Sequence, residues 1–287
     1  MGELTEDAPT PASRAVDEEV RFPPLPQLAR LGLIALLLGL AIAGWTVTDR
    51  RMAGMDAGPG TDPGVIGFYL ATWVVMMAAM MFPSIVPMVL TYARIQRGKR
   101  ERGLPVTIGA TFAFVTGYLV TWTATGLGFY GVLAGARAVD LGGITWDEAG
   151  RYVAGGVIVA AGVYQFTPLK QTCLTKCRDP FLFLLTSWRS GRTGALRMGI
   201  EHGFWCVGCC WALMAALFAL GLMSVGWMAF VAVLIAIEKL LPWKFVANRG
   251  IAILLLVLGI SVALVPNKVP GLTIPTPTRD HAVMVDM

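Results

Sequence analysis

Charged residues are scarce in this sequence. Asp, Glu, Lys and Arg together make up 14% of the 287 residues, whereas 56% are hydrophobic. A soluble domain usually carries about a quarter charged residues, so the composition excludes an ordinary soluble enzyme or binding module. The apolar residues form long runs without a short amphipathic period, which predicts an all-α, polytopic transmembrane helix bundle.

Several familiar motifs are also missing. The sequence contains no phosphate-binding glycine loop, no kinase or protease signature and no repeat of fixed period. Because no ATPase signature is present, any transport would be passive, gradient-driven or dependent on a partner. Basic residues form no domain of their own, so we expect no nucleic-acid partner.

Seven apolar runs come near the roughly 20 residues that a helix needs to cross about 30 Å of hydrocarbon. They lie near residues 28–48, 65–91, 106–130, 152–168, 197–222, 225–241 and 250–266. The fourth, sixth and seventh are short, so each is also compatible with a re-entrant segment. The apolar stretch 181–188 is too short to span and is expected as a re-entrant or interfacial helix.

The net charge of +5 is explained by topology, since hydrophilic segments on alternate sides carry 17 and 6 of the 23 basic residues. The positive-inside rule places the N-terminus in the cytoplasm and the C-terminus outside. We therefore predict a multi-pass protein embedded in the lipid bilayer of the cytoplasmic (inner) membrane. It comprises a disordered acidic cytosolic tail (1–27), a transmembrane domain (28–266) and a short Pro-rich extracytoplasmic tail (267–287).

Reactive residues are concentrated in the fifth run. The stretch HGFWCVGCCWALM contains one of the two histidines and three of the five cysteines. At 100° per residue, three cysteines lie at about +40°, −20° and +80° from His202 on the helix; they are Cys206, Cys209 and Cys210. All four side chains share one face, as ligands of a single ion would. The alternative is that these small residues only fill helix contacts.

The other two cysteines, Cys173 and Cys177, follow the fourth run in KQTCLTKCRDP. They stand at the predicted cytoplasmic edge, so the segment 169–189 would have to fold inward for them to reach the deeper cysteines. Thiols persist in a reducing cytosol, which favours metal coordination over structural disulfides. Cys206 and Cys209 also have a redox spacing, so a thiol–disulfide oxidoreductase that uses this pair with the other two stays open.

Five methionines occur within sixteen positions of the second run. Met77, Met80 and Met81 are candidate ligands, because a thioether is soft and uncharged and binds Cu(I) without burying a carboxylate. Simple packing of lipid-compatible side chains is the alternative for the same stripe. Pro83 and Pro87 free backbone carbonyls and kink helices, which is common where a helix lines a cavity.

An ionisable pair, Glu238 and Lys239, ends the sixth run. Such side chains either snorkel to the membrane interface or face a polar site, and we expect the interface. Glu201 lies about 100° from His202 on the fifth helix. It is a poor candidate for binding the ion itself, and at most it contacts a residue that binds the ion.

Three blocks of this sequence resemble a bacterial family of predicted metal-binding integral membrane proteins. They are WVVMMAAMMFPS, YQFTPLKQTCLTKCRDP and GIEHGFWCVGCCWALM, and the similarity runs over roughly residues 65–240. The resemblance implies a ligand set comprising Cys173, Cys177, His202, Cys206, Cys209 and Cys210. It implies no particular ion and no reaction.

The residues and the resemblance together predict an integral membrane protein that binds a soft metal ion for transport or handling. Thiolates with thioethers favour Cu(I), and cysteines with one histidine suit Zn(II) as the second choice. A soluble metal-binding protein is a candidate partner. Two alternatives stay open: the oxidoreductase, which is less favoured than a non-enzymatic role, and a structural membrane subunit whose cysteines only pack.

Overall fold

A computed structural model describes residues 25–53, 65–138, 149–221, 224–241, 244–269 and 272. Within these ranges the regular elements are all helical, which confirms the all-α prediction. The helices are α2 (Gln27–Met52), α3 (Ile66–Glu101), α4 (Ala110–Ala138), α5 (Arg151–Tyr164), α6 (Pro168–Arg178), α7 (Pro180–Ser187), α8 (Gly191–Gly221), α9 (Val225–Leu240), α10 (Lys244–Leu264) and the short η3 (Pro266–Lys268). The predicted tails, 1–27 and 267–287, lie mostly outside the described residues.

Within the described ranges, five helices are long and apolar enough to cross a membrane: α2, α3, α4, α8 and α10. The count is six if α5 and α6, which meet at a bend of 67°, form one broken span. Helix α9 has 16 residues, somewhat fewer than the roughly 20 that a full crossing needs. The architecture is compatible with a membrane protein, while the seven spans and their orientation stay predictions.

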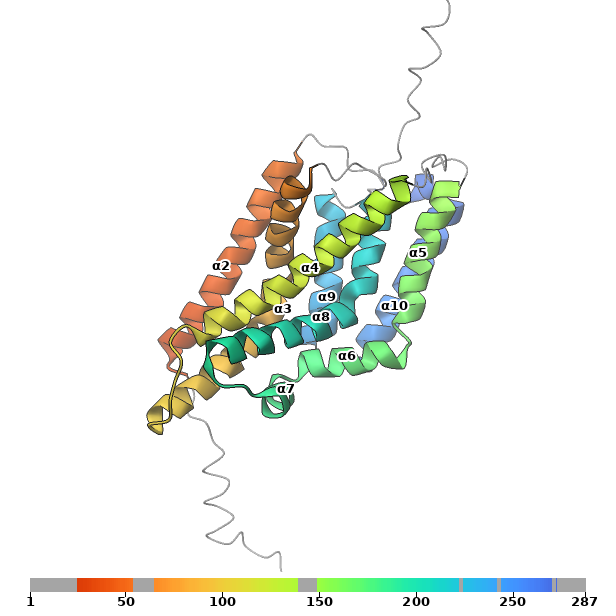
Figure 1. Cartoon of the computed structure of the whole chain (residues 1–287). Helices are drawn as coiled ribbons and strands as arrows, with labels where there is room; N and C mark the ends of the chain where they lie inside the picture. The colour runs from red at the N-terminus through yellow and green to blue at the C-terminus, as the bar shows by residue number, and fades with distance from the viewer. Residues whose placement is uncertain are drawn as a thin grey trace, which may run out of the picture.

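Helix α8 is the central element of the bundle. It packs along α4 and also contacts α5, α6 and α9 (Figure 1). At the α4–α8 crossing, any Cβ placed on Gly117 or Gly199 would collide with the backbone of the facing helix. Small residues of this kind let two helix backbones approach closely within a membrane. The close approach buries the part of α8 that carries the three cysteines.

The chain bends sharply between α5 and α6. Thr167 caps α6 by accepting a hydrogen bond from the backbone N–H of Lys170 at 3.3 Å, and Pro168 occupies the first turn. Both are helix-starting features, since proline's missing N–H is not needed at that position. Helix α6 therefore starts in a new direction and runs crosswise at one end of the bundle, beneath α8 (Figure 1).

The segment 169–189 forms the two short helices α6 and α7. Both turn apolar side chains into the core, including Leu174 on α6 and Phe183 and Leu184 on α7. The segment therefore folds back onto the bundle, as contact between the two cysteine groups requires. Helix α7 has eight residues, far fewer than a span, and its depth in a membrane stays a prediction.

Candidate metal centre

Three thiols from two separate helices converge at the junction of α6 and α8. Cys177 comes from α6, whereas Cys206 and Cys209 come from α8, and all three Sγ atoms lie within 4.8 Å of one another. Three sulfurs that each stand about 2.3 Å from a central ion are about 4 Å apart, so a small adjustment closes them around an ion. Among the described residues, this thiol trio is the one group of three or more His, Cys, Asp or Glu side chains placed to share an ion.

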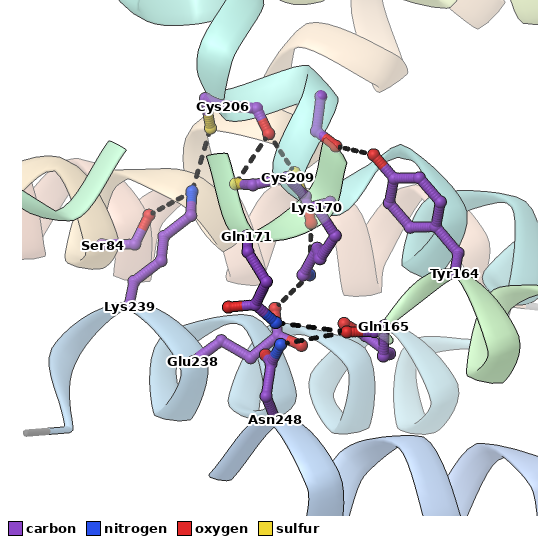
Figure 2. Close-up of polar contacts among 12 residues, drawn as sticks. Ser84, Tyr164, Gln165, Lys170, Gln171, Cys206, Cys209, Glu238, Lys239 and Asn248 are labelled. Carbon is purple, nitrogen blue, oxygen red and sulfur yellow. Dashed lines mark hydrogen bonds and ion pairs between the residues drawn. The ribbon is translucent and has the colours of Figure 1, made fainter. Parts of the chain in front are cut away.

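Cys206 contacts polar side chains from two further helices. Its Sγ lies 2.9 Å from Lys239 Nζ on α9 and 3.0 Å from the Tyr118 hydroxyl on α4. Lys239 Nζ is also 3.4 Å from Ser84 Oγ on α3 (Figure 2). An ammonium beside the sulfur offsets part of the negative charge that thiolate ligands carry.

The prediction that Glu238 and Lys239 reach the membrane interface is wrong. Their exposed fractions are 1% and 9%, and both side chains face the protein interior. Lys239 points toward Cys206, while Glu238 forms an ion pair of 2.7 Å with Lys170 of α6. Helix α6 lies across this end of α9 and gives Glu238 its partner, whereas α8 and α3 supply those of Lys239, so neither side chain needs to reach water.

Lys170 is a further residue of the site that the sequence prediction missed. Its Nζ also donates a hydrogen bond to the backbone carbonyl of Cys209, so one ammonium contacts both α8 and α9 (Figure 2). A sequence signal existed. Lys170 precedes Cys177 by seven residues, a spacing that places both side chains within about 20° on one helix face.

Hydrogen bonds also fix the turn that precedes α6. The Tyr164 hydroxyl donates to the backbone carbonyl of Gly208 on α8 at 2.6 Å. The backbone carbonyl of Gln165 accepts from the side-chain amides of Gln171 and Asn248, at 3.3 and 3.2 Å, and Asn248 belongs to α10 (Figure 2). The start of α6 is therefore held against two long helices.

Cys173 and Cys210 are buried but lie outside the thiol trio. Cys173 packs against α8 at Gly208, where an added Cβ would stand 2.7 Å from its Sγ. The Sγ of Cys210 donates to the backbone carbonyl of Cys206 at 2.8 Å. All five cysteines are free thiols. The structure therefore brings together three of the five predicted cysteine ligands.

His202 is buried in an aromatic environment. Its ring centroid lies 6.0, 5.9 and 5.2 Å from those of Phe114, Tyr118 and Phe183. Among the described residues its Nδ1 has no hydrogen-bond partner. The histidine is on the predicted face of α8, one turn from Cys206, but it is not part of the thiol trio.

The methionine stripe of α3 lies in the core. Met77, Met80 and Met81 are all buried and belong to the main hydrophobic cluster. The Ser84 hydroxyl donates to the Met81 carbonyl at 2.8 Å and is also the α3 contact of Lys239. This part of α3 therefore borders the thiol trio through Lys239, a placement that suits both ligation and packing.

The comparison with known proteins supports a metal-binding family. A family model for PpoB2, described as a copper chaperone, matches residues 70–262, a range that includes every cysteine, His202 and the methionine stripe. No curated protein and no solved structure matches the chain. The family match covers more than half of the 287 residues, and the chain therefore belongs to the PpoB2 copper chaperone family.

Proposed function

We propose that this protein is a membrane-embedded copper chaperone that holds one Cu(I) ion in the thiol trio of Cys177, Cys206 and Cys209. The observation that carries the proposal is the convergence of three sulfurs from two helices to within 4.8 Å of one another. The copper chaperone description of the matching family supports copper as the cargo. Soft thiolate ligands select Cu(I) among the metals available to a cell.

The make-up of the trio favours Cu(I) over Zn(II). Zinc in structural sites is almost always four-coordinate, and the described residues place no fourth His, Cys, Asp or Glu ligand within the same distance of the trio. Cu(I) can be coordinated by only two or three soft ligands. Three thiolates around a monovalent ion also leave excess negative charge, and Lys239 supplies a compensating positive charge beside Cys206.

The proposed setting is the cytoplasmic membrane, with seven crossings. Taking α5 with α6 as one bent span, and α9 as a short one, adds two crossings to the five long helices. The density of basic residues in 169–197 then puts α6 at the cytoplasmic face. A soluble metal-binding partner in the cytosol would meet Cys177 first. With no ATPase signature in the sequence, we propose copper handling or passive transfer in place of pumping.

Competition titration of the full chain tests the proposal. Anaerobically purified protein is titrated with Cu(I) against a chromogenic Cu(I) chelator, and we expect one tight equivalent with a sulfur-only shell in X-ray absorption. Serine at any trio position should weaken binding by more than about 100-fold, beyond the range typical of residues that only support a ligand. Serine is a hard, poorly ionised ligand of similar size, so it tests softness at constant shape.

Each helix of the site provides its own matched control. Cys173→Ser on α6 and Cys210→Ser on α8 alter buried cysteines outside the trio, and we expect affinity within about threefold of the wild type for both. Full copper binding in the trio variants would refute the ligand assignment. A preference for Zn(II) with nitrogen neighbours would refute Cu(I) as the cargo and point to His202.

A thiol–disulfide oxidoreductase is the second candidate function. Cys206 and Cys209 keep a redox spacing, and Cys177 lies close enough to exchange with them. Cys173, the other member of the predicted second pair, packs against Gly208 away from the trio. Copper-free protein whose thiols cycle between free and bridged forms with a quinone or thioredoxin partner would favour this candidate over the chaperone.

A further inference from the structure

The ion pair between Lys170 and Glu238 is the most deeply buried charged contact near the site. The side chains are 0% and 1% exposed, and Nζ to Oε2 is 2.7 Å. Lys170 also donates to the Cys209 carbonyl, so a single ammonium joins α6 to α8 and α9 (Figure 2). Buried charges are expensive to hold and persist only where paired and hydrogen bonded.

Helix α6 has little apolar surface with which to dock. Of its 11 residues only Leu169 and Leu174 are large and aliphatic, and Leu169 is 61% exposed. The turn before α6 is pinned by Tyr164, which fixes where the helix begins. It does not fix how the helix is rotated about its axis. Rotation decides whether Cys177, two turns further on, faces α8.

Lys170 fixes that rotation because it lies on the same face of α6 as Cys177. With its ammonium held between Glu238 and the Cys209 carbonyl, the face that carries Cys177 is turned toward Cys206 and Cys209. At the far end Arg178 donates to the Leu241 carbonyl. That side chain is only half-buried, so water competes for its contact more effectively than for the one made by Lys170.

We infer that Lys170, through its buried ion pair with Glu238, is a positioning residue that docks α6 so that Cys177 completes the thiol trio. The inference rests on the proposed function, because the thiol trio is proposed to be a copper site. The docking of α6 itself does not depend on bound copper. It assigns Lys170 no contact with the ion. Two ligands are thus built into α8, and the third is delivered by a short helix that an ion pair holds in place.

Thiol crosslinking measures the docking directly. In a Cys173→Ser/Cys210→Ser background, a short bis-alkylating reagent such as dibromobimane should bridge Cys177 to an α8 thiol. Lys170→Met leaves Glu238 buried and unpaired, so the crosslinking rate should fall by more than about tenfold. Glu238→Leu leaves the Lys170 ammonium buried without its partner, and it should lower the crosslinking rate to a similar extent. The double variant removes both charges without restoring the tie, so its crosslinking should stay slow, whereas recovery to the background rate would mean that the single variants act only through the charge left unpaired.

Copper affinity provides the second readout. If Lys170 acts through Cys177, Lys170→Met should lower Cu(I) affinity as far as Cys177→Ser does. Combining the two should add no more than about twofold, because residues that act as a unit are non-additive. Thr175→Val is the control on the same helix: its exposed hydroxyl donates within α6, to the Gln171 carbonyl, and the substitution should change neither readout.

Crosslinking at the background rate in Lys170→Met would overturn the positioning role, and so would a double variant that recovers the background rate. If Lys170→Met fails to accumulate, Glu238→Gln keeps a hydrogen bond to the ammonium while removing the charge, and it should slow crosslinking by about threefold or more; an unchanged rate overturns the inference. Crosslinking needs no metal. If the wild-type protein binds no copper, but crosslinking is fast with Lys170 and slow in Lys170→Met, the proposed function is rejected and the positioning role stands.

Discussion

Helices α6 and α8 both carry cysteines one turn apart, but the two helices hold them in different ways. Helix α8 has 31 residues and is packed by four other helices, so its thiols are fixed by the core of the bundle. Helix α6 has 11 residues and depends on polar ties for its position. Helix α6 gives one cysteine to the thiol trio and α8 gives two, and on each helix a further cysteine only packs: Cys173 on α6 and Cys210 on α8.

The comparison suggests how a chaperone keeps copper and still releases it. Under the proposed function, two rigid ligands would retain the ion, and a third ligand on a weakly packed element would complete or open the shell. Elements that move are drawn from the less stable part of a fold, with few buried apolar contacts. Helix α6 fits that description, whereas α8 does not.

Removing both fixed ligands should have the largest effect. Cys206→Ser/Cys209→Ser leaves Cys177 as the only sulfur of the trio, and a lone thiolate on a short helix cannot retain Cu(I) against a chelator. We expect no stoichiometric copper by elemental analysis after reconstitution. Cys177→Ser leaves two thiols on α8 and should retain weakened binding. A full equivalent of copper in the double variant would show that the fixed helix does not hold the ion.

Among the variants that leave the thiols and α6 unaltered, Lys239→Met should have the largest effect, because it removes the cation 2.9 Å from Cys206. Loss of a residue that supports a ligand lowers metal affinity by about 10- to 100-fold. The measurement is the same chelator competition, repeated at low and high salt. Added salt should not restore the lost affinity, because the charge of Lys239 acts in a buried site and salt screens mainly exposed charges. Wild-type affinity in this variant would remove Lys239 from the site.

Gly208→Ala tests the docking of α6 from the side of α8. The new methyl would stand 2.7 Å from Cys173 Sγ and 3.4 Å from its Cβ, so either the Cys173 side chain turns or the short helix shifts and carries Cys177 with it. We expect about a tenfold loss of Cu(I) affinity. Shortening the opposing side chain with Cys173→Ala should restore it.

Gly156→Ala is the control for that substitution, because a Cβ at this glycine meets no described atom within 4 Å. It should leave copper affinity unchanged. A Gly208→Ala protein with normal affinity would show that the trio tolerates the added methyl, and one that Cys173→Ala fails to rescue would show that its loss of affinity does not come from contact with Cys173.

The same contrast explains what the sequence could predict. Long apolar runs and the 100° helical step predict helices, and they place the cysteines of α8 on one face. They do not predict which cysteine of α6 meets that face. The answer depends on the 67° bend between α5 and α6 and on how α6 is rotated about its own axis. The step also places His202 on the correct face, although its ring is held one turn away among aromatic side chains.

The pairing of the buried charges could not be predicted from the sequence, for a physical reason. Lys170 stands in a hydrophilic segment next to an apolar run, where the ordinary expectation is a solvated residue that sets topology. Glu238 and Lys239 end a helix, where long side chains usually snorkel. Only the return of α6 across the end of α9 makes Lys170 and Glu238 neighbours, while Lys239 meets Cys206 of α8, and contacts between distant segments leave no local pattern.

The methionine stripe should show the smallest effect, and it separates retention of copper from its transfer. Met77→Leu/Met81→Leu keeps buried volume nearly constant, a change that well-packed cores tolerate. The thiol trio is untouched, so equilibrium Cu(I) affinity should stay within about twofold.

If the stripe passes copper to the trio, loss of two soft thioethers should slow copper uptake by about threefold while protein abundance stays constant. The rate is measured by stopped-flow exchange from a Cu(I) chelator. An unchanged rate would make these methionines packing residues, and a large loss of affinity would make them ligands, so either result decides how far the soft-ligand site extends beyond α6 and α8.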